Sequence, residues 1–207
     1  MNRRLRLAVA RLYLVVDGAH AHVLEAALRG GVDVVQLRDK ELPDDKLVRA
    51  AEPFRRACDA HGALFVLNDR PDLVAACGAD GVHVGQRDAS VAEARALVGD
   101  ERIVGLSVET VVQLDAIDGA DYLGVGAVFA TPTKTEAEAA GLELVRAAAV
   151  QVGIPWFAIG GIDLENVAEV VMAGAPGVAV VRAIRDADNP EAAARELRAA
   201  LGEPASA

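Results

Sequence analysis

Two aspartates in the middle of the chain each follow a short apolar run. Asp69 comes directly after FVLN, beside Asn68, and Asp88 lies three residues past GVHVG. Taken singly, each aspartate is typical of a helix cap or a turn. Together they favour a Mg²⁺ site, because this ion takes one or two carboxylates and completes its shell with substrate phosphates and water. A carboxylate pair for general acid–base catalysis is the alternative, but it gives no role to the cations nearby.

Those cations belong to the preceding run, VVQLRDKE. Side chains alternate along a strand, so Gln36, Arg38 and Lys40 share one face. If that face is the interior of a barrel, two cations and an amide form an anion site in a chain of formal charge −10. The alternative is a solvated strand end in which Arg38 pairs with a neighbouring carboxylate. A buried arginine needs a partner of its own, which favours the anion site.

Three later segments carry polar or glycine-rich sequence. Ser107 in GLSV lacks the His/Asp order of a nucleophile elbow, which indicates a polar contact to substrate. The polar loop with Thr131, Thr133 and Lys134 could close over phosphates, the alternative being an ordinary surface loop. AIGGI and AVVRAI end the last two runs, where backbone N–H groups can approach an anion. We therefore predict a metal-assisted and a metal-free anion site, and two phosphorylated ligands.

All of these residues stand at or near the ends of regularly spaced elements. Short Val/Ile/Leu-rich runs alternate with segments of helical period, which is the signature of a parallel sheet. The runs cover residues 11–17, 32–39, 63–69, 81–85, 102–108, 121–129, 155–161 and 177–184. Helices are expected near 19–29, 43–60, 71–77, 90–98, 109–118, 139–152, 163–173 and 190–201. Start signals are a capping box in SVAE at 90–93, Pro71 in a first turn and Asp163 as an N-cap.

This order of elements predicts an α/β fold, a closed (β/α)8 TIM barrel in a single domain over residues 1–207. An open doubly wound sheet is the alternative, but eight near-regular units of about 25 residues fit closure better. Residues 202–207 are expected to form a disordered tail. Barrel active sites lie at the C-terminal ends of the strands, and neighbouring strands are ~4.8 Å apart, so Asp69 and Asp88 can converge on one ion.

Composition argues against several classes of partner. The 31 acidic residues against 21 basic ones disfavour a nucleic acid or an anionic membrane surface. Arg11 and Asp17 interrupt the N-terminal apolar stretch, and no run reaches the ~18 apolar residues of a membrane helix, so we expect a cytoplasmic protein. Cys58 and Cys77 lack metal or redox spacing and are expected to be buried hydrophobes. His83, inside a run, is expected to be a hydrogen-bonded interior residue.

The motifs VVQLRDK, LNDR, GADGVHVGQRD, GLS, DYLGVGAVFATPTKT, AIGGI and GVAVVRAI, in this order and spacing, resemble those of thiamine-phosphate synthases, also called thiamine-phosphate pyrophosphorylases. The resemblance implies a cytoplasmic transferase of thiamine biosynthesis. Such an enzyme joins hydroxymethylpyrimidine diphosphate to a thiazole or carboxythiazole phosphate and releases diphosphate. Oligomeric state and the preferred thiazole form are left open.

The same resemblance implies the roles of individual residues. The pyrimidine diphosphate would contact Gln36, Leu37, Arg38, Asp39, Lys40, Asn68, Ser107 and Lys134, of which Arg38, Lys40, Ser107 and Lys134 would be catalytic. Asp69 and Asp88 would hold Mg²⁺. The thiazole phosphate would contact Thr131, Pro132, Thr133, Gly161, Val181 and Arg182. Arg182 is a departure, because many members have serine there; the lost hydroxyl contact is worth about 1 kcal/mol, and the guanidinium could add a cation.

The implied mechanism follows from charge. Mg²⁺, Arg38, Lys40 and Lys134 would neutralise the departing diphosphate, so the C–O bond ionises before the thiazole nitrogen attacks, with no covalent enzyme intermediate. One rival is a thiazole tautomerase-like barrel, which needs an acid–base side chain, commonly histidine, near the loop that here offers Lys134. The other is a non-catalytic barrel that binds phosphate ligands without releasing diphosphate.

Overall fold

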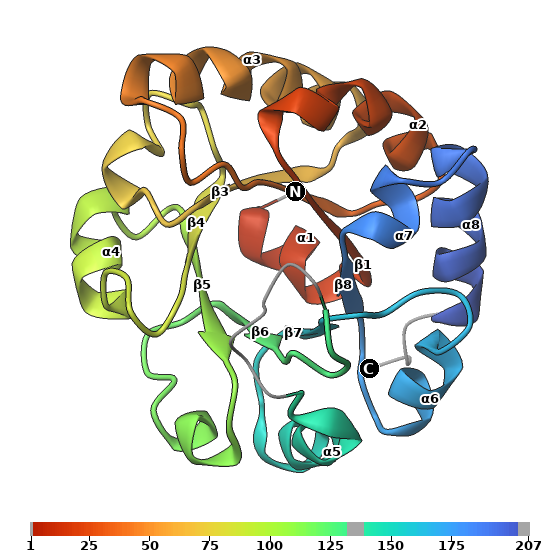
Figure 1. Cartoon of the computed structure of the whole chain (residues 1–207). Helices are drawn as coiled ribbons and strands as arrows, with labels where there is room; N and C mark the ends of the chain where they lie inside the picture. Colours follow the sequence, from red (N-terminus) through yellow and green to blue (C-terminus); the bar gives the residue numbers. More distant parts are fainter. Residues whose placement is uncertain (1, 132–138, 203–207) are drawn as a thin grey trace.

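The computed structural model describes residues 2–131 and 139–202. Eight parallel strands follow one another around a closed barrel, and β8 pairs with β1. Figure 1 shows this ring with helices around it. The strands are β1 (Leu12–Val16), β2 (Val34–Leu37), β3 (Leu64–Asn68), β4 (Gly81–Val84), β5 (Ile103–Val108), β6 (Tyr122–Val125), β7 (Trp156–Ile159) and β8 (Val178–Val180). Each lies within a predicted run, so the closed barrel is confirmed and the open sheet is excluded.

The outer helices pack their apolar faces on the sheet. Those expected from the sequence are α2 (Leu24–Arg29), α3 (Asp44–His61), α4 (Val91–Val98), α5 (Gly141–Gln151), α6 (Val167–Met172) and α8 (Pro190–Ala200). In α3, Leu47, Ala51, Phe54 and Cys58 recur at helical spacing and are buried. Ser90 forms the predicted capping box at the start of α4.

Several connections are shorter or differently wound than predicted. Residues 71–77 and 109–118 contain only the 3₁₀ turns η2 (Pro71–Leu73) and η3 (Val111–Asp115), and η1 (Gly18–Val23) precedes α2. Pro71 does occupy a first helical turn. Where the chain passes between strands in about a dozen residues, little length is left for an α-helix.

Two predicted boundaries near the strand ends were wrong. Asp163 is not the N-cap of α6, which begins at Val167; its carboxylate instead accepts from the N–H of Glu165 at 3.0 Å. The last run does not stay extended to residue 184. It ends at Val180, where pairing with β1 and β7 stops, and the short helix α7 (Arg182–Arg185) follows.

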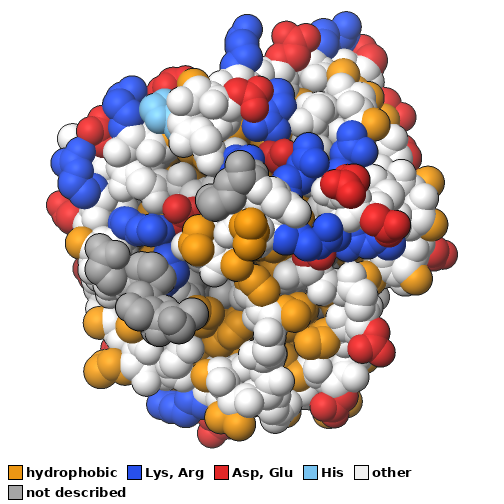
Figure 2. Space-filling model, turned by 180° about the vertical axis from the view of Figure 1, so that it is seen from behind, with side chains coloured by type: hydrophobic (Ala, Val, Ile, Leu, Met, Phe, Trp, Pro, Cys, Tyr) orange, Lys and Arg blue, Asp and Glu red, His pale blue; other side chains and the backbone are white. Residues whose placement is uncertain are grey.

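A helix that the sequence did not predict precedes β1. In α1 (Arg3–Val9), Leu7 is buried in the lower interior of the barrel. Arg3 Nε contacts Asp80 Oδ1 at 2.9 Å, and Arg4 Nε contacts Asp121 Oδ1 at 2.7 Å. These aspartates directly precede β4 and β6, so α1 covers the N-terminal end of the barrel, and in Figure 1 it is seen through the ring of strands. Figure 2 views this end from behind, with charged side chains interspersed and hydrophobic ones gathered near the middle.

Three aspartates at this end, which we call the base aspartates, tie neighbouring strands together. They are Asp33, Asp80 and Asp121, directly before β2, β4 and β6. Each accepts a backbone N–H from the start of the preceding strand: Leu12 at 2.9 Å, Phe65 at 3.0 Å and Val104 at 2.8 Å. Each also pairs with an arginine from an outer helix, namely Arg198, Arg55 and Arg95. The base aspartates therefore act as structural caps of the strands.

Cys58 and Cys77 are free and buried, as expected. Along the described residues, none of the helices has both the length and the apolar character that a membrane crossing demands. The predicted tail at 202–207 lies, apart from Gly202, outside the described residues. That residues 1–207 form one domain stays a prediction.

Candidate active site

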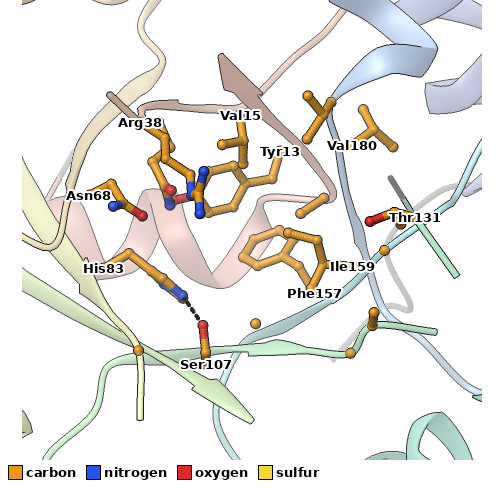
Figure 3. Close-up of a pocket in the computed structure, with 18 of the residues that line it drawn as sticks. Tyr13, Val15, Arg38, Asn68, His83, Ser107, Thr131, Phe157, Ile159 and Val180 are labelled. Atoms are coloured by element: carbon orange, nitrogen blue, oxygen red, sulfur yellow. Dashed lines mark hydrogen bonds between the residues drawn. The ribbon is translucent and has the colours of Figure 1, made fainter. Parts of the chain in front are cut away.

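A cavity of about 860 Å³ opens at the C-terminal ends of the strands. Side chains from all eight strands line it, and the rings of Tyr13, Tyr122 and Phe157 are among those that lie deepest, each at most 2% exposed. Figure 3 shows Arg38, Asn68, His83 and Ser107 on one side of this space and Thr131 on the other. The cavity is therefore at the end of the barrel where the sequence places the chemistry.

The three alternating residues of β2 and its loop all line the cavity, as predicted. Gln36 is 4% exposed, whereas Arg38 and Lys40 are exposed at the mouth. Arg38 forms no ion pair or hydrogen bond with the described residues, so the pairing with a neighbouring carboxylate is not found among them. The expectation that Arg38 is buried was wrong, because the strand ends at Leu37 and the chain there already meets solvent. Leu37 itself is buried in the outer core.

Asp69 lies at the turn that leaves β3. Its φ of 60° is left-handed, a conformation that aspartate tolerates better than most residues. Its carboxylate does not cap η2; instead Oδ2 lies 2.8 Å from Lys40 Nζ. The sequence prediction that these two residues lie together is therefore confirmed, and one cation already neutralises Asp69.

Asp88 lies at the turn that follows β4. Its Oδ2 accepts the N–H of Gly85 at 2.9 Å, and Oδ1 has no hydrogen bond with the described residues. A Cβ on Gly85 would stand 2.7 Å from Oδ2, so any larger residue there would displace the Asp88 carboxylate from this position. Asp88, Asp69 and Asn68 line one side recess of about 230 Å³, together with Asp39, Lys40, Leu42 and Arg70.

Nothing in the described parts of the chain forms a cluster of three or more His, Cys, Asp or Glu side chains suited to a metal. The recess offers oxygen ligands from three aspartates, of which Asp69 and Asp88 are the predicted pair and Asp39 is the third, and from the amide of Asn68. Mg²⁺ is usually bound by one or two carboxylates plus substrate oxygens and water. The donor set therefore fits Mg²⁺ held jointly with a phosphorylated ligand.

The opposite side of the cavity comes from β6 to β8. Thr131, Gly161, Val181 and Arg182 line it, while Pro132, Thr133 and Lys134 lie outside the described residues. Gly161 has a φ of +66°, and a Cβ there would meet Phe129 Cβ at 2.8 Å. Beside it, the N–H of Phe129 donates to Gly160 O at 2.9 Å. The glycines are thus needed for the close approach of the segment after β6, a reason that the sequence analysis missed.

A connected set of polar groups crosses the barrel interior and was not predicted from the sequence; we call it the interior hydrogen-bond chain. Gln36 Nε2 donates to Tyr13 Oη at 2.8 Å, and Tyr13 Oη lies 2.9 Å from Tyr122 Oη. Tyr122 Oη lies 3.0 Å from His83 Nδ1, and His83 Nε2 lies 2.9 Å from Ser107 Oγ. The expectation that His83 is a hydrogen-bonded interior residue is confirmed.

Burial raises the pKa of both tyrosine hydroxyls, so each keeps its proton. The sequence does carry a signal for this chain. Polar or hydroxyl side chains at inward-facing positions of otherwise apolar runs, such as Tyr122 and His83, mark a polar interior.

Comparison with known proteins gives one consistent family. The family profile described as thiamine monophosphate synthase matches residues 12–184. The chain is 49% identical to the thiamine-phosphate synthase of Thermobifida fusca over 99% of this chain and 98% of that protein. It is also 49% identical to that of Saccharopolyspora erythraea, over 96% of each.

Solved structures agree with this result. Thiamine phosphate pyrophosphorylase from Pyrococcus furiosus superposes with a TM-score of 0.86 at 34% identity, covering 95% of this chain and 97% of that one. A 3-hexulose-6-phosphate synthase, with a TM-score of 0.67 and 21% identity, shares the fold alone.

Proposed function

The chain belongs to the thiamine monophosphate synthase family, and we propose that its cavity binds the two phosphorylated substrates on opposite sides. The enzyme condenses hydroxymethylpyrimidine diphosphate with thiazole phosphate to give thiamine phosphate and diphosphate. The observation that carries the proposed arrangement is the division of the cavity. Cations and carboxylates from β2 to β4 line one side, and Thr131 and the glycines after β7 line the other.

The pyrimidine diphosphate is assigned to the side formed by β2 to β5. Arg38 and Lys40 meet the diphosphate, and Gln36, Asn68 and Ser107 meet the rest of the molecule or its bridging oxygens. Leu37 can contribute its main-chain atoms to this site, because its side chain is buried in the hydrophobic core between the strands and the outer helices. Asp39, in the side recess, and Lys134, outside the described residues, complete the assignment.

Asp69 and Asp88 are assigned to Mg²⁺. Their support is the shared recess and the free Oδ1 of Asp88 described above. When bound, the ion supplies positive charge to the oxygens of the departing diphosphate. Lys40, held 2.8 Å from Asp69, stands in the same recess and can contact those oxygens as well.

The thiazole phosphate is assigned to Thr131, Pro132, Thr133, Gly161, Val181 and Arg182. The described members of this set line the cavity, and Figure 3 shows Thr131 on the side away from Arg38 and Asn68. Arg182 stands where many relatives have serine, and its exposed guanidinium adds a cation to a site otherwise built from hydroxyl and backbone groups.

In the proposed mechanism the protein supplies position and electrostatics. Arg38, Lys40 and Lys134 stabilise the charge that develops on the diphosphate, so the C–O bond at the pyrimidine methylene breaks and its electron pair leaves with the diphosphate. The thiazole nitrogen, held nearby, then attacks the pyrimidine methylene carbon. The buried rings of Tyr122 and Phe157 keep water from the floor of the cavity, which protects the cation from hydrolysis.

The test is to incubate the protein with both phosphorylated substrates, with Mg²⁺ or with a chelator, and to measure diphosphate and thiamine phosphate together. Equal amounts of the two products are expected with Mg²⁺, and omission of either substrate should abolish thiamine phosphate. Folded protein that forms neither product would overturn the function, and full activity in the chelator would overturn the metal assignment alone. A cytoplasmic site of action is part of the proposal.

A further inference from the structure

The interior hydrogen-bond chain crosses the barrel at the floor of the cavity. Its five members come from five different strands: Tyr13 from β1, Gln36 from β2, His83 from β4, Ser107 from β5 and Tyr122 from β6. Four contacts of 2.8 to 3.0 Å connect them without a gap. The chain begins at the buried Gln36 and ends at Ser107, which lines the cavity.

The protons of this chain have one consistent order. Gln36 Nε2 donates to Tyr13, so the single proton of Tyr13 is available for Tyr122. Tyr122 then donates its proton to His83 Nδ1, which leaves the ring proton of His83 on Nε2, facing Ser107. Ser107 accepts from His83, so its hydroxyl proton points elsewhere.

The opposite order leaves a buried donor without a partner. Tyr13 would then accept from both Gln36 and Tyr122, and its proton would have no acceptor among the described residues. Tyr13 is 2% exposed, and an unsatisfied donor at such a place is strongly unfavourable. The donor at Gln36 therefore sets the direction of every bond that follows.

Two glycines make room for the rings of this chain. A Cβ on Gly105 would lie 2.1 Å from Cζ of Tyr122, and a Cβ on Gly124 would lie 3.2 Å from Cε1 of His83. Both glycines are in the middle of strands, where glycine weakens the sheet unless a close approach requires it. The sheet is thus shaped around these two rings.

We propose that the interior hydrogen-bond chain is a positioning device, which fixes His83 as its Nε2–H tautomer and presents the Ser107 hydroxyl as a hydrogen-bond donor to the pyrimidine diphosphate. The ligand in this statement rests on the proposed function, whereas the proton order does not. A donor held toward the diphosphate gains strength as negative charge develops there, so the chain acts on turnover more than on substrate binding. His83, Tyr122 and Tyr13 are positioning residues in this scheme, because they act through Ser107.

The first test measures the proton order without turnover. Ring ¹⁵N chemical shifts of the histidines report the tautomer, and His83→Gln identifies the signals of His83 among the four histidines. The Nε2–H tautomer is expected in the parent protein at neutral pH, and a mixture of tautomers in Tyr122→Phe, where the donor to Nδ1 is lost. A parent protein with Nδ1–H, or a variant with an unchanged tautomer, would overturn the proposal even if the enzyme is fully active.

The second test separates turnover from binding. Tyr122→Phe removes one oxygen and keeps the ring, and we expect kcat to fall about 10- to 100-fold with less than about a threefold change in KM, as for a mispositioned group. Leu64→Ala is the matched control, because Leu64 is buried in the same interior cluster and does not line the cavity. It should lower the melting temperature and leave kcat and the His83 tautomer unchanged. An unchanged kcat in Tyr122→Phe contradicts the proposal.

The third test asks whether Gln36 acts through the chain. Gln36→Glu, assayed near pH 8, replaces the donor by an acceptor and reverses the order, in addition to any direct loss of substrate contact. In the Tyr122→Phe background the link to His83 is already broken. Gln36→Glu should therefore lower kcat by a clearly smaller factor in that background than in the parent protein. Strictly additive losses would show that Gln36 does not set the orientation of Ser107.

Discussion

At the N-terminal end of the barrel, every base aspartate accepts a backbone N–H and pairs with an arginine; Asp80 contacts Phe65 N–H, Arg55 and Arg3. At the C-terminal end, Asp88 keeps a carboxylate oxygen without a hydrogen bond among the described residues, and Arg38 has no partner among them. Aspartate and arginine side chains thus have internal partners at the N-terminal end, whereas at the C-terminal end Asp88 and Arg38 keep groups that can bind a ligand.

This difference separates stability from function. Asp80 is 5% exposed, and a buried carboxylate without its partners would oppose folding. Asp69, by contrast, pairs with Lys40 at the rim of an open recess. A ligand that enters the recess can replace either partner of this ion pair. Substitutions at the two ends should therefore change different measured quantities.

The largest effect is expected for Asp69→Asn. Loss of one carboxylate from the proposed metal site should lower kcat about a thousandfold, because the metal that it holds stabilises the negative charge of the departing diphosphate. Steady-state kinetics at saturating Mg²⁺ measure this, and urea unfolding should show little change in the free energy of unfolding.

The control for this variant is Asp188→Asn, an exposed aspartate without an ion pair or hydrogen bond among the described residues. It removes the same charge and should keep full activity. If Asp69→Asn turned over normally with the usual dependence on Mg²⁺, the metal assignment would be lost.

Next in size is Asp80→Ala at the other end. Arg55 would lose a buried partner, and its Nε already has no hydrogen-bond partner within the described part of the chain, so the free energy of unfolding should fall by about 3 kcal/mol. Asp59→Ala is the matched control, because Asp59 contacts the same Arg55 at 2.7 Å but is 67% exposed; it should cost less than about 1 kcal/mol. Unfolding in urea measures both, and kcat of the folded fraction should stay near the parent value. Equal costs would contradict the role of burial.

A smaller effect concerns acid stability. Burial by itself raises the pKa of Asp80, but hydrogen bonds from Phe65 N–H, Arg55 and Arg3 outweigh it and hold the pKa below its usual range. A depressed folded-state pKa adds stability that is present above the unfolded pKa of about 3.9 and is lost as pH falls through the folded value. The gap in unfolding free energy between the parent and Asp80→Ala should therefore narrow as pH falls below about 4. Urea unfolding at a series of pH values measures this difference in unfolding free energy. A difference that grows as pH falls would contradict a depressed pKa of Asp80 in the folded state.

The smallest effect is expected for Arg4→Ala in α1. Arg4 is 43% exposed, and Asp121 keeps Arg95 and the N–H of Val104 as partners. The free energy of unfolding should fall by about 0.5 kcal/mol, which is typical of exposed pairs. Thermal unfolding is a sufficient measurement. A loss above about 2 kcal/mol would show that the charges of α1, rather than its buried Leu7, hold it in place.

The strands were predictable because Val, Leu and Ile runs of strand length are a local signal, and residues that follow parallel strands meet at one end of a barrel. Asp69 and Asp88 therefore reached one recess as expected. The pairing of Lys40 with Asp69 follows from the same rule, since β2 and β3 are neighbours in the barrel.

The rest depended on partners far apart in the sequence. α1 is seven residues long and too short to be stable alone; it exists because Arg4 reaches Asp121 and Leu7 enters the barrel. Tyr13 and Tyr122, separated by 109 positions, meet only once the barrel has closed. No local pattern reports such a contact, which is why the interior hydrogen-bond chain was not predicted.

The position of α1 over the N-terminal end of the barrel has a consequence for protein engineering. The charged contacts that hold α1, from Arg3 to Asp80 and from Arg4 to Asp121, involve no residue that lines the cavity. The charged groups that fasten α1 over the N-terminal end therefore stand apart from the cavity. A designer who reshapes the mouth for another pair of substrates can leave this end untouched as a foundation for the new site.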